Sequence, residues 1–424
     1  MNKIPLTKLD LFVYTETLDS GLTIYVIPKK NVNNIYATYT AKYGSNVNEF
    51  KIPGENKFIK VNDGIAHFLE HKLFETEDGT DPFTFFGSNG ADANASTTVD
   101  KTTYLFTGPD KFMENLNYLI DYVETPYFTD ENIEKEKGII EEEILMYADN
   151  PYSNLYEKSI YNSFVLEPIK IPVIGTKESI NGITKEMLYS CYNTFYHPSN
   201  MILVVVGNVE AKHVINIARD NHNKKGYKKI EPIIIKEYKE PDVVAKKSEI
   251  LKKNVSMPKV ALNYKFNITK LKNYQLPTIR SLIYQFFNIK IGLTSKFNED
   301  IKREGLCNDY VDISVLNTKK HILVSLFADT SKPKELIKKI RKEFEDKEID
   351  ELELERKKKV LKSSYIYSGD NIFRLGNKVI NNIINYETIV DDYSFVEGLN
   401  IETLNNIISK LDFTNTCEVI IDSK

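Results

Sequence analysis

The sequence has no tryptophan and little cysteine or histidine, and each shortage narrows what the protein can be. Its 424 residues include three cysteines and six histidines. Three thiols cannot all pair, and Cys191, Cys307 and Cys417 are too scattered to form a metal knuckle. We therefore expect reduced thiols in a cytoplasmic protein. Without tryptophan, the 26 tyrosines and 22 phenylalanines are expected to fill the core rather than a cofactor box.

Strong charge of one sign and long apolar runs are also missing. The formal net charge is −4, so nothing indicates a nucleic-acid partner or an anionic membrane surface. No uninterrupted run of about eighteen apolar residues occurs, which argues against a membrane span. Residues 1–30 lack an apolar region behind positive charges, so no signal peptide is expected. The length is sufficient for more than one domain, each with a sizeable core.

Two of the histidines lie four residues apart in the stretch His67-Phe68-Leu69-Glu70-His71. Four residues make about one helical turn, so both imidazoles leave the same helix face and can bind one metal ion. Glu70 lies beside this pair, where its carboxylate can take a proton from a water that the metal activates. This is the inverted zinc-peptidase motif, H-x-x-E-H. It predicts a catalytic zinc site that needs a third protein ligand.

The third ligand is expected from an acidic helical segment at residues 132–146. Catalytic zinc sites use three protein ligands and leave one position open, and two histidines with a carboxylate suit this type. Glu136 and Glu143 lie two turns apart, so both can face the helix of His67 and His71. One can bind zinc while the other orients a histidine from behind. Their spacing alone does not rank them.

Further segments accompany the motif, at residues 63–74, 90–97, 134–143, 175–180 and 195–201. Together they resemble the pitrilysin/insulinase family of zinc metallopeptidases, which includes the mitochondrial processing peptidases. The resemblance is dense from about residue 20 to 210 and weaker afterwards. It implies one zinc ion per chain, with Glu143 as the third ligand and Glu136 as the carboxylate behind a ligand.

Residues 90–97 resemble the family's substrate-pairing strand. Its small side chains permit close backbone approach, so an extended peptide can add to this strand by β-augmentation. The resemblance assigns substrate binding to Asn94, with Ala93 and Ala95 beside it. Because such pairing recognises backbone more than sequence, the expected substrates are unstructured or extended peptides.

A second pair of candidate residues lies in the C-terminal half. In the family, an arginine and a tyrosine seven residues apart help to bind substrate and stabilise the oxyanion, and Arg303 and Tyr310 have this spacing. The local sequence departs from the family's pattern, because aligning Gly305 and Leu306 puts Asn308 where the tyrosine normally stands. The pair is therefore either catalytic or a structural helix-end arginine and strand tyrosine.

The order of the expected elements divides the chain into two similar halves. The first half carries strand patterns at 22–27, 35–42, 102–106 and 201–206, and helical patterns at 110–123 and 130–147. The second carries strand patterns at 259–266, 322–327 and 417–421, and a helical pattern at 276–287. We expect an α+β fold of two homologous units, each a mainly antiparallel sheet packed with helices. The predicted domains are 1–221 and 254–424, joined by a linker at 222–253.

Metal chemistry is expected in the first unit alone. Aligning residues 128–145 with 349–366 puts Lys357 opposite Glu136 and Ser364 opposite Glu143. The second half contains a single histidine, His321. One zinc-bearing and one zinc-free unit correspond to half of the four-unit clamshell of long-chain family members.

The resemblance implies a zinc-dependent endopeptidase that cleaves short unstructured peptides inside a dimeric chamber, with Glu70 as general base. Peptide processing, including leader removal, falls within this expectation. The expected partner is a homologous chain, either identical or different, that forms a homodimer or a heterodimer. The alternative is a non-catalytic or partner-dependent subunit that uses the fold for binding or as a scaffold. The intact zinc motif and Glu143 favour the enzyme.

Overall fold

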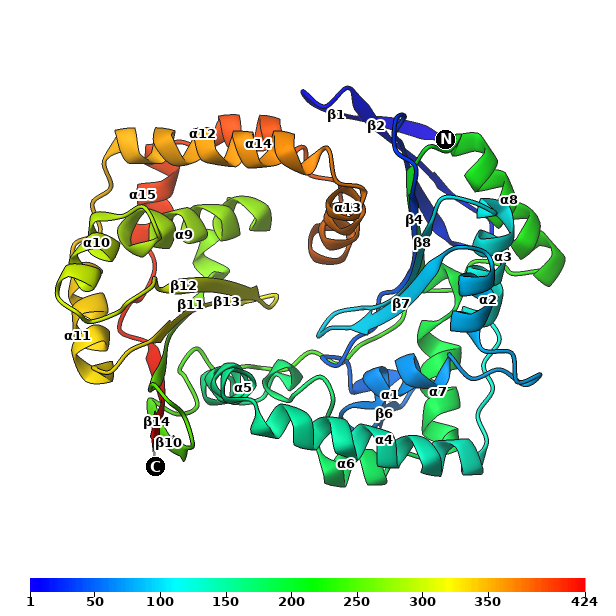
Figure 1. Cartoon of the computed structure of the whole chain (residues 1–424), viewed down its shortest axis with the longest axis horizontal. Coiled ribbons are helices and arrows are strands. Elements are labelled where there is room, and N and C mark those ends of the chain that lie inside the picture. Colours follow the sequence, from blue (N-terminus) through cyan, green and yellow to red (C-terminus); the bar gives the residue numbers. More distant parts are fainter. Residues whose placement is uncertain (424) are drawn as a thin grey trace. The chain divides into compact units, whose positions relative to one another are not determined.

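The computed structural model describes residues 1–423 and divides the chain into two compact units, whose elements are labelled in Figure 1. Unit 1 consists of Met1–Ile144, Pro172–Glu237 and Ser364–Tyr393. Unit 2 consists of Leu145–Ile171, Tyr238–Ser363 and the residues from Ser394 onward. Each unit therefore combines segments from both halves of the chain.

Unit 1 is built on a seven-stranded sheet with the order β1-β2-β3-β9-β4-β8-β7. Its strands are β1 (Asn2–Leu6), β2 (Leu11–Thr17), β3 (Thr23–Pro28), β4 (Ile35–Ala41), β7 (Asp92–Thr97), β8 (Thr102–Gly108) and β9 (Met201–Gly207). Only the pair of β3 and β9 is parallel. A separate hairpin consists of β5 (Glu49–Lys51) and β6 (Phe58–Lys60).

The helices of unit 1 cover both faces of this sheet. They are α1 (Ile65–Lys72), α2 (Pro82–Ser88), α3 (Phe112–Val123), α6 (Lys177–Asn181), α7 (Lys185–Phe195), α8 (Ala211–Lys225), α13 (Ile372–Tyr386) and the 3-10 helix η2 (Pro198–Asn200). Two further helices, α4 (Asp130–Asp149) and α12 (Glu351–Ser368), contain a boundary between the units. The inner strands β3 and β9 are mostly apolar because both faces are buried, so Ile24 and Val26 enter one core while Tyr25 and Ile27 enter the other.

The second core of unit 1 depends on a helix from the far end of the sequence. Helix α13 packs on β4 and β9 through a row of apolar side chains, Leu375, Val379, Ile380 and Ile383. The hydroxyl of Tyr36 donates a hydrogen bond of 3.2 Å to Oδ1 of Asn377 on the same helix. Figure 1 shows α13 beside β4 and β8.

Unit 2 contains a five-stranded sheet with the order β10-β14-β11-β13-β12. Its strands are β10 (Ser248–Lys253), β11 (Lys259–Asn267), β12 (Asp312–Asn317), β13 (His321–Asp329) and β14 (Thr416–Ser423). Only β10 and β14 are parallel. The remaining helices are α5 (Pro151–Ser163), α9 (Leu276–Ile291), α10 (Lys296–Arg303), α11 (Pro333–Glu343), α14 (Asp392–Gly398), α15 (Ile401–Ser409) and the 3-10 helices η1 (Pro168–Lys170) and η3 (Thr269–Leu271).

One face of this second sheet is covered by a helix from the first half of the chain. Helix α5 packs on β11 and β14, and its Leu155 joins Ala261, Cys417 and Val419 in a small apolar core. The fully buried Nζ of Lys265 lies 2.6 Å from Oε1 of Glu240, which closes the adjoining loop.

The predicted α+β class with two mainly antiparallel units is confirmed, but the compact units depart from the contiguous domains 1–221 and 254–424. Residues 222–225 complete α8 and residues 248–253 form β10, both inside the expected linker 222–253. Helices α5 and α13 were not among the predicted elements. Even an apolar helical pattern would not indicate which sheet its face covers, because periodicity is a local property.

None of the helices within residues 1–423 combines the length and the apolar character that a membrane crossing needs.

Candidate metal centre

Both motif histidines lie on α1, next to the edge strand β7 (Figure 1). The helix begins after Gly64, whose φ of +87° is a left-handed conformation. A Cβ atom there would lie 2.5 Å from the carbonyl oxygen of Ile174, so only glycine permits this close approach. The rings of His67 and His71 leave one helix face, with centroids 4.5 Å apart.

A carboxylate from α4 completes a three-residue cluster with these imidazoles. Oε2 of Glu143 lies 3.7 Å from Nε2 of His67 and 3.7 Å from Nε2 of His71. The three ligand atoms all lie within 4.8 Å of one another, and no other such group occurs in residues 1–423. Two imidazoles and one carboxylate are a zinc donor set, and three protein ligands leave one position open, as in catalytic sites. The donor set therefore fits zinc.

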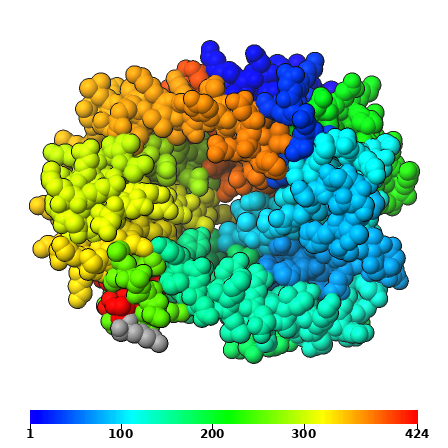
Figure 2. Space-filling view, viewed as in Figure 1, coloured from blue at the N-terminus to red at the C-terminus, as the bar shows by residue number. Residues whose placement is uncertain are grey.

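Behind the cluster, Glu136 contacts the far side of one imidazole. Its Oε1 lies 2.8 Å from Nδ1 of His71, and its side chain is buried. Helix α4 is otherwise a surface helix with few buried positions, visible in teal at the lower edge of Figure 2. The two glutamates left unranked by spacing thus occupy different places, one facing both Nε2 atoms and the other facing Nδ1.

A buried lysine attaches the two helices to each other. Nζ of Lys72, the last residue of α1, donates a hydrogen bond of 3.2 Å to the backbone carbonyl of Asn132 on α4. The same ammonium forms an ion pair of 2.6 Å with Glu75 and has no exposed surface. This contact helps to hold the histidines at a set distance from the glutamates.

The two imidazoles differ in their proton affinity. Burial, and then the charge of His71, lowers the pKa of His67 to about 3. Burial also lowers the pKa of His71, but the hydrogen bond and charge of Glu136, with the charges of Glu70 and Glu143, outweigh it and raise the pKa. His67 is therefore neutral and ready to bind a cation, whereas His71 competes for a proton.

Glu70, the predicted general base, lies between α1 and the end of β7. Its Oε2 accepts a hydrogen bond of 2.5 Å from the hydroxyl of Thr97. Burial raises the pKa of Glu70, and the negative charge of Glu143 acts in the same direction. The bonds from Thr97 and the charge of His71 oppose the rise without cancelling it. A partly desolvated carboxylate with a raised pKa suits proton transfer near neutral pH.

The predicted substrate residues Ala93, Asn94 and Ala95 lie on β7, which is the last strand of its sheet. The backbone N–H of Thr98 bonds to the carbonyl of Lys101, so the backbone groups of Thr98 point toward the partner strand β8. Backbone groups alternate in direction along an antiparallel strand, so those of Ala93, Ala95 and Thr97 face away from β8. In agreement, the N–H of Ala95 bonds to Oδ1 of Asn94. The strand therefore presents a free edge.

The second predicted pair lies in unit 2. Arg303 ends α10, its side chain is 75% exposed, and it forms an ion pair of 2.5 Å with Asp300. Tyr310 is 40% exposed and lies between α10 and β12. A catalytic role for this pair stays a prediction.

Comparison with known proteins adds a family to this geometry. Residues 59–177 match the family model "Insulinase (Peptidase family M16)", and residues 182–361 match the model "Peptidase M16 inactive domain". The zinc protease YmfH of Bacillus subtilis is 36% identical over 420 residues, which cover 96% of each chain. The chain belongs to the M16 family. It is a zinc protease, and the predictions of the family, of enzymatic activity and of zinc are confirmed.

Solved structures agree with the M16 fold over nearly the whole chain. The crystal structure of a putative M16-like peptidase from Alicyclobacillus acidocaldarius has a TM-score of 0.92 at 28% identity, with 99% of this chain and 100% of that chain covered. A chain of complex III2 from Candida albicans has a TM-score of 0.72 at 12% identity, with 96% of this chain and 95% of that one covered. At that identity the second likeness shows the fold alone.

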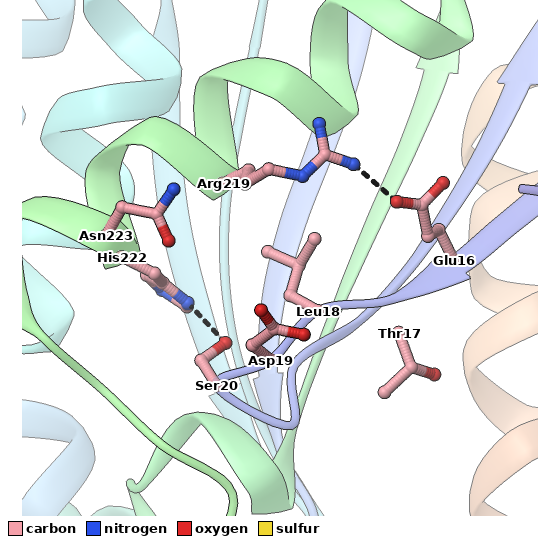
Figure 3. Close-up of a pocket in the computed structure, with 8 residues that line it drawn as sticks. All are labelled: Glu16, Thr17, Leu18, Asp19, Ser20, Arg219, His222 and Asn223. Atoms are coloured by element: carbon pink, nitrogen blue, oxygen red, sulfur yellow. Dashed lines mark hydrogen bonds and ion pairs between the residues drawn. The ribbon is translucent and has the colours of Figure 1, made fainter.

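A second polar cluster of this M16 protease lies between α8 and the turn after β2. Oγ of Ser20 lies 2.9 Å from Nδ1 of His222, whose Nε2 lies 2.9 Å from Oε1 of Glu124. Figure 3 shows Ser20 and His222 at this turn, with the nearby ion pair of Arg219 and Glu16. This cluster has the residue types of a serine-hydrolase triad. It cannot act as one, because Ser20 is 2% exposed and no substrate can reach it. The cluster fastens α8 to the sheet.

The sequence did not single out Thr97 as a functional residue. Threonine at the end of a strand is common, and its contact with Glu70 joins residues 27 positions apart in the chain. No local pattern reports such a contact. Only its place in the strand that resembles the substrate-pairing segment could have drawn attention to it.

Proposed function

We propose that this zinc protease is an endopeptidase that cleaves short unstructured peptides held in extended form along β7. The observation that carries the proposal is the contact between Glu70 and Thr97, 2.5 Å long, which joins the motif helix to the free edge of the strand. A peptide paired with this edge runs toward the carboxylate that acts as general base. Its scissile bond then meets the base and the metal ligands together.

Substrate selection follows from the kind of contact that a free strand edge makes. The backbone groups of Ala93 and the carbonyl of Ala95 bond to the peptide backbone, and the N–H of Ala95 joins them once the peptide displaces Oδ1 of Asn94. The methyl groups of both alanines leave room for close approach. Asn94 lies on the same strand, with Oδ1 already bonded to the N–H of Ala95. Only a segment free of its own secondary structure can offer unpaired backbone groups, so folded proteins are poor substrates.

The chain's own residues divide the chemistry between them. His67, His71 and Glu143 would hold the zinc ion, and Glu136 fixes the ring of His71 through Nδ1. Zinc, when bound, supplies Lewis acidity that polarises the scissile carbonyl and makes a water more acidic. Glu70 takes a proton from the attacking water and delivers it to the leaving amine. Its raised pKa favours the uptake of the proton.

A second homologous chain is part of this proposal. Unit 1 contains the metal cluster, and residues 182–361, which extend from unit 1 into unit 2, match the family's inactive-domain model. We propose that two such chains, identical or homologous, enclose the peptide and exclude folded proteins by size. Peptide processing, such as leader removal, in the cytoplasm is the setting in which we place this activity.

The test is cleavage of a mixture of unstructured peptides by the purified zinc-loaded chain, read by mass spectrometry. Glu70→Gln protein runs beside it as the control for contaminating proteases, and metal analysis verifies that both proteins hold zinc. We expect fragments that require Glu70. A folded protein containing one of the cleaved sequences should stay intact until it is unfolded.

The outcomes separate the two functions considered for the chain. Cleavage that survives Glu70→Gln would remove Glu70 as base and overturn the mechanism. Zinc-loaded protein that cleaves no peptide, alone or with a homologous chain added, would support the binding or scaffold subunit instead. Activity that appears only with the added chain would establish a heterodimer.

A further inference from the structure

We propose that Thr97 is a positioning residue for Glu70, so that the strand which pairs with substrate also orients the general base. The inference rests on the proposed function, because it names a further residue needed for the same reaction. Thr97 is the last residue of β7, and its hydroxyl donates to Oε2 of Glu70 over 2.5 Å.

The backbone N–H of Thr97, like its side chain, lies on the side of β7 that faces Glu70. This N–H, like the hydroxyl, lowers the pKa of the Glu70 carboxyl. This is the position that the alternation of the strand predicts, because residues 93, 95 and 97 share the edge that faces away from β8. One strand edge thus offers its first two outward positions to a peptide and its third to the base. Movement of β7 therefore moves the paired peptide and the base together.

The hydroxyl of Thr97 has a defined donor direction. Glu70, as an ionised base, only accepts hydrogen bonds, so the one proton of Thr97 is committed to it. The remaining neighbour of the hydroxyl is Oγ1 of Thr102, 3.3 Å away, which itself lies 3.0 Å from the carbonyl oxygen of Tyr43. Because Thr102 donates its own proton to that carbonyl, no proton remains for the contact between the two threonines, and the hydroxyl bond from Thr97 is what restricts rotation of the Glu70 carboxylate.

The orientation of Glu70 matters because a base must stay within hydrogen-bond reach of the proton that it takes. Without Thr97 Oγ1, the carboxylate loses this donor and can rotate about its side-chain bonds. A displacement of about 1 Å can cost roughly 100-fold in rate. The contact involves no metal ligand, so its loss should leave zinc binding unchanged.

The experiment compares Thr97→Val, which keeps the shape and removes the donor, with Thr97→Ser, which keeps the donor. We expect Thr97→Val to lower kcat by roughly 10- to 100-fold with little change in KM or zinc affinity. Thr97→Ser should recover most of the kcat. Thr107→Val is the matched control, because Thr107 lies on β8 and its buried hydroxyl has no hydrogen-bond partner in residues 1–423.

A second measurement is independent of activity. Crystal structures of the metal-free wild type and Thr97→Val should differ in the position or the number of conformers of the Glu70 carboxylate. An unmoved carboxylate, an equal loss of kcat in the serine variant, or a loss explained by lower zinc content would overturn the inference. If the wild type cleaves no peptide but the carboxylate moves, the proposed function fails while the positioning role stands.

Discussion

Glu136 and His71 form a hydrogen-bonded pair, with Oε1 of the carboxylate 2.8 Å from Nδ1 of the ring. The same ring presents its other nitrogen, Nε2, to Glu143 at 3.7 Å. One helix, α4, therefore places one carboxylate near Nε2 and another at Nδ1 of the same histidine on α1. Carboxylates behind metal-bound histidines fix the ring and increase its basicity.

Removal of the supporting carboxylate should weaken zinc binding without abolishing it. Glu136→Leu is expected to lower zinc affinity by roughly 10- to 100-fold, and Glu136→Gln by less, because the amide oxygen still accepts a hydrogen bond. Competition with a metal chelator measures the affinity. Glu142→Gln removes a charge from an exposed position of the same helix and serves as the control. Equal effects of Glu136→Gln and Glu142→Gln would mean that only net charge matters.

Zinc affinity should depend on pH through a single histidine. Zinc binds neutral imidazole, and the pKa of His67, at about 3, keeps this ring neutral in the working range. The pKa of His71 is raised, so a proton competes with zinc as the pH falls through that value. Below the pKa of His71, zinc affinity should fall by about tenfold per pH unit, because each zinc ion that binds must displace one proton.

The matched variant for this pH dependence is Glu136→Gln. The hydrogen bond and charge of Glu136 raise the pKa of His71, so their removal should move the onset of proton competition to lower pH. Chelator competition between about pH 5 and 8 checks both statements. If the pH dependence of zinc affinity showed that binding releases two protons, His67 would also titrate in this range. That result would contradict the lowered pKa of His67.

The start of α1 should tolerate no side chain at Gly64. Alanine there takes on the left-handed backbone and places Cβ 2.5 Å from the carbonyl oxygen of Ile174. Gly79→Ala is the control, because Gly79 is also left-handed, with φ +73°, but has no atom within 4 Å of the added Cβ. The control should cost about 1–2 kcal/mol, and Gly64→Ala distinctly more. Urea unfolding measures both, and equal costs would exclude the close approach as a cause.

The fold of unit 1 should require helix α13. A fragment of residues 1–237 leaves the face of β4 and β9 uncovered, so we expect it to aggregate or to bind a hydrophobic dye. A peptide of residues 364–393 should bind the fragment and restore a cooperative unfolding transition. The same peptide with Leu375→Asp and Val379→Asp is the control. A fragment that unfolds cooperatively without the peptide would mean that α13 is dispensable.

The zinc motif and most strands could be predicted because each depends on a short stretch of chain. His67 and His71 share a face through one turn of α1, and the apolar run of β9 was recognised within one residue of its observed bounds. Glu143 and Glu136 were both identified as candidates, but the spacing along α4 places them on similar faces. Their separation into a residue facing Nε2 and one facing Nδ1 follows from how α4 lies against α1.

The sequence by itself predicted the motif histidines, the glutamate beside them, two candidates for the third ligand and the two mainly antiparallel units. It did so because helical and strand periodicities are set by the backbone over a few residues. The tertiary structure alone decided that α5 and α13 cover the sheets of the opposite halves, and that Thr97 contacts Glu70. Those contacts join residues far apart in the chain. Any buried apolar face or strand end satisfies the same local pattern, and only packing selects its partner.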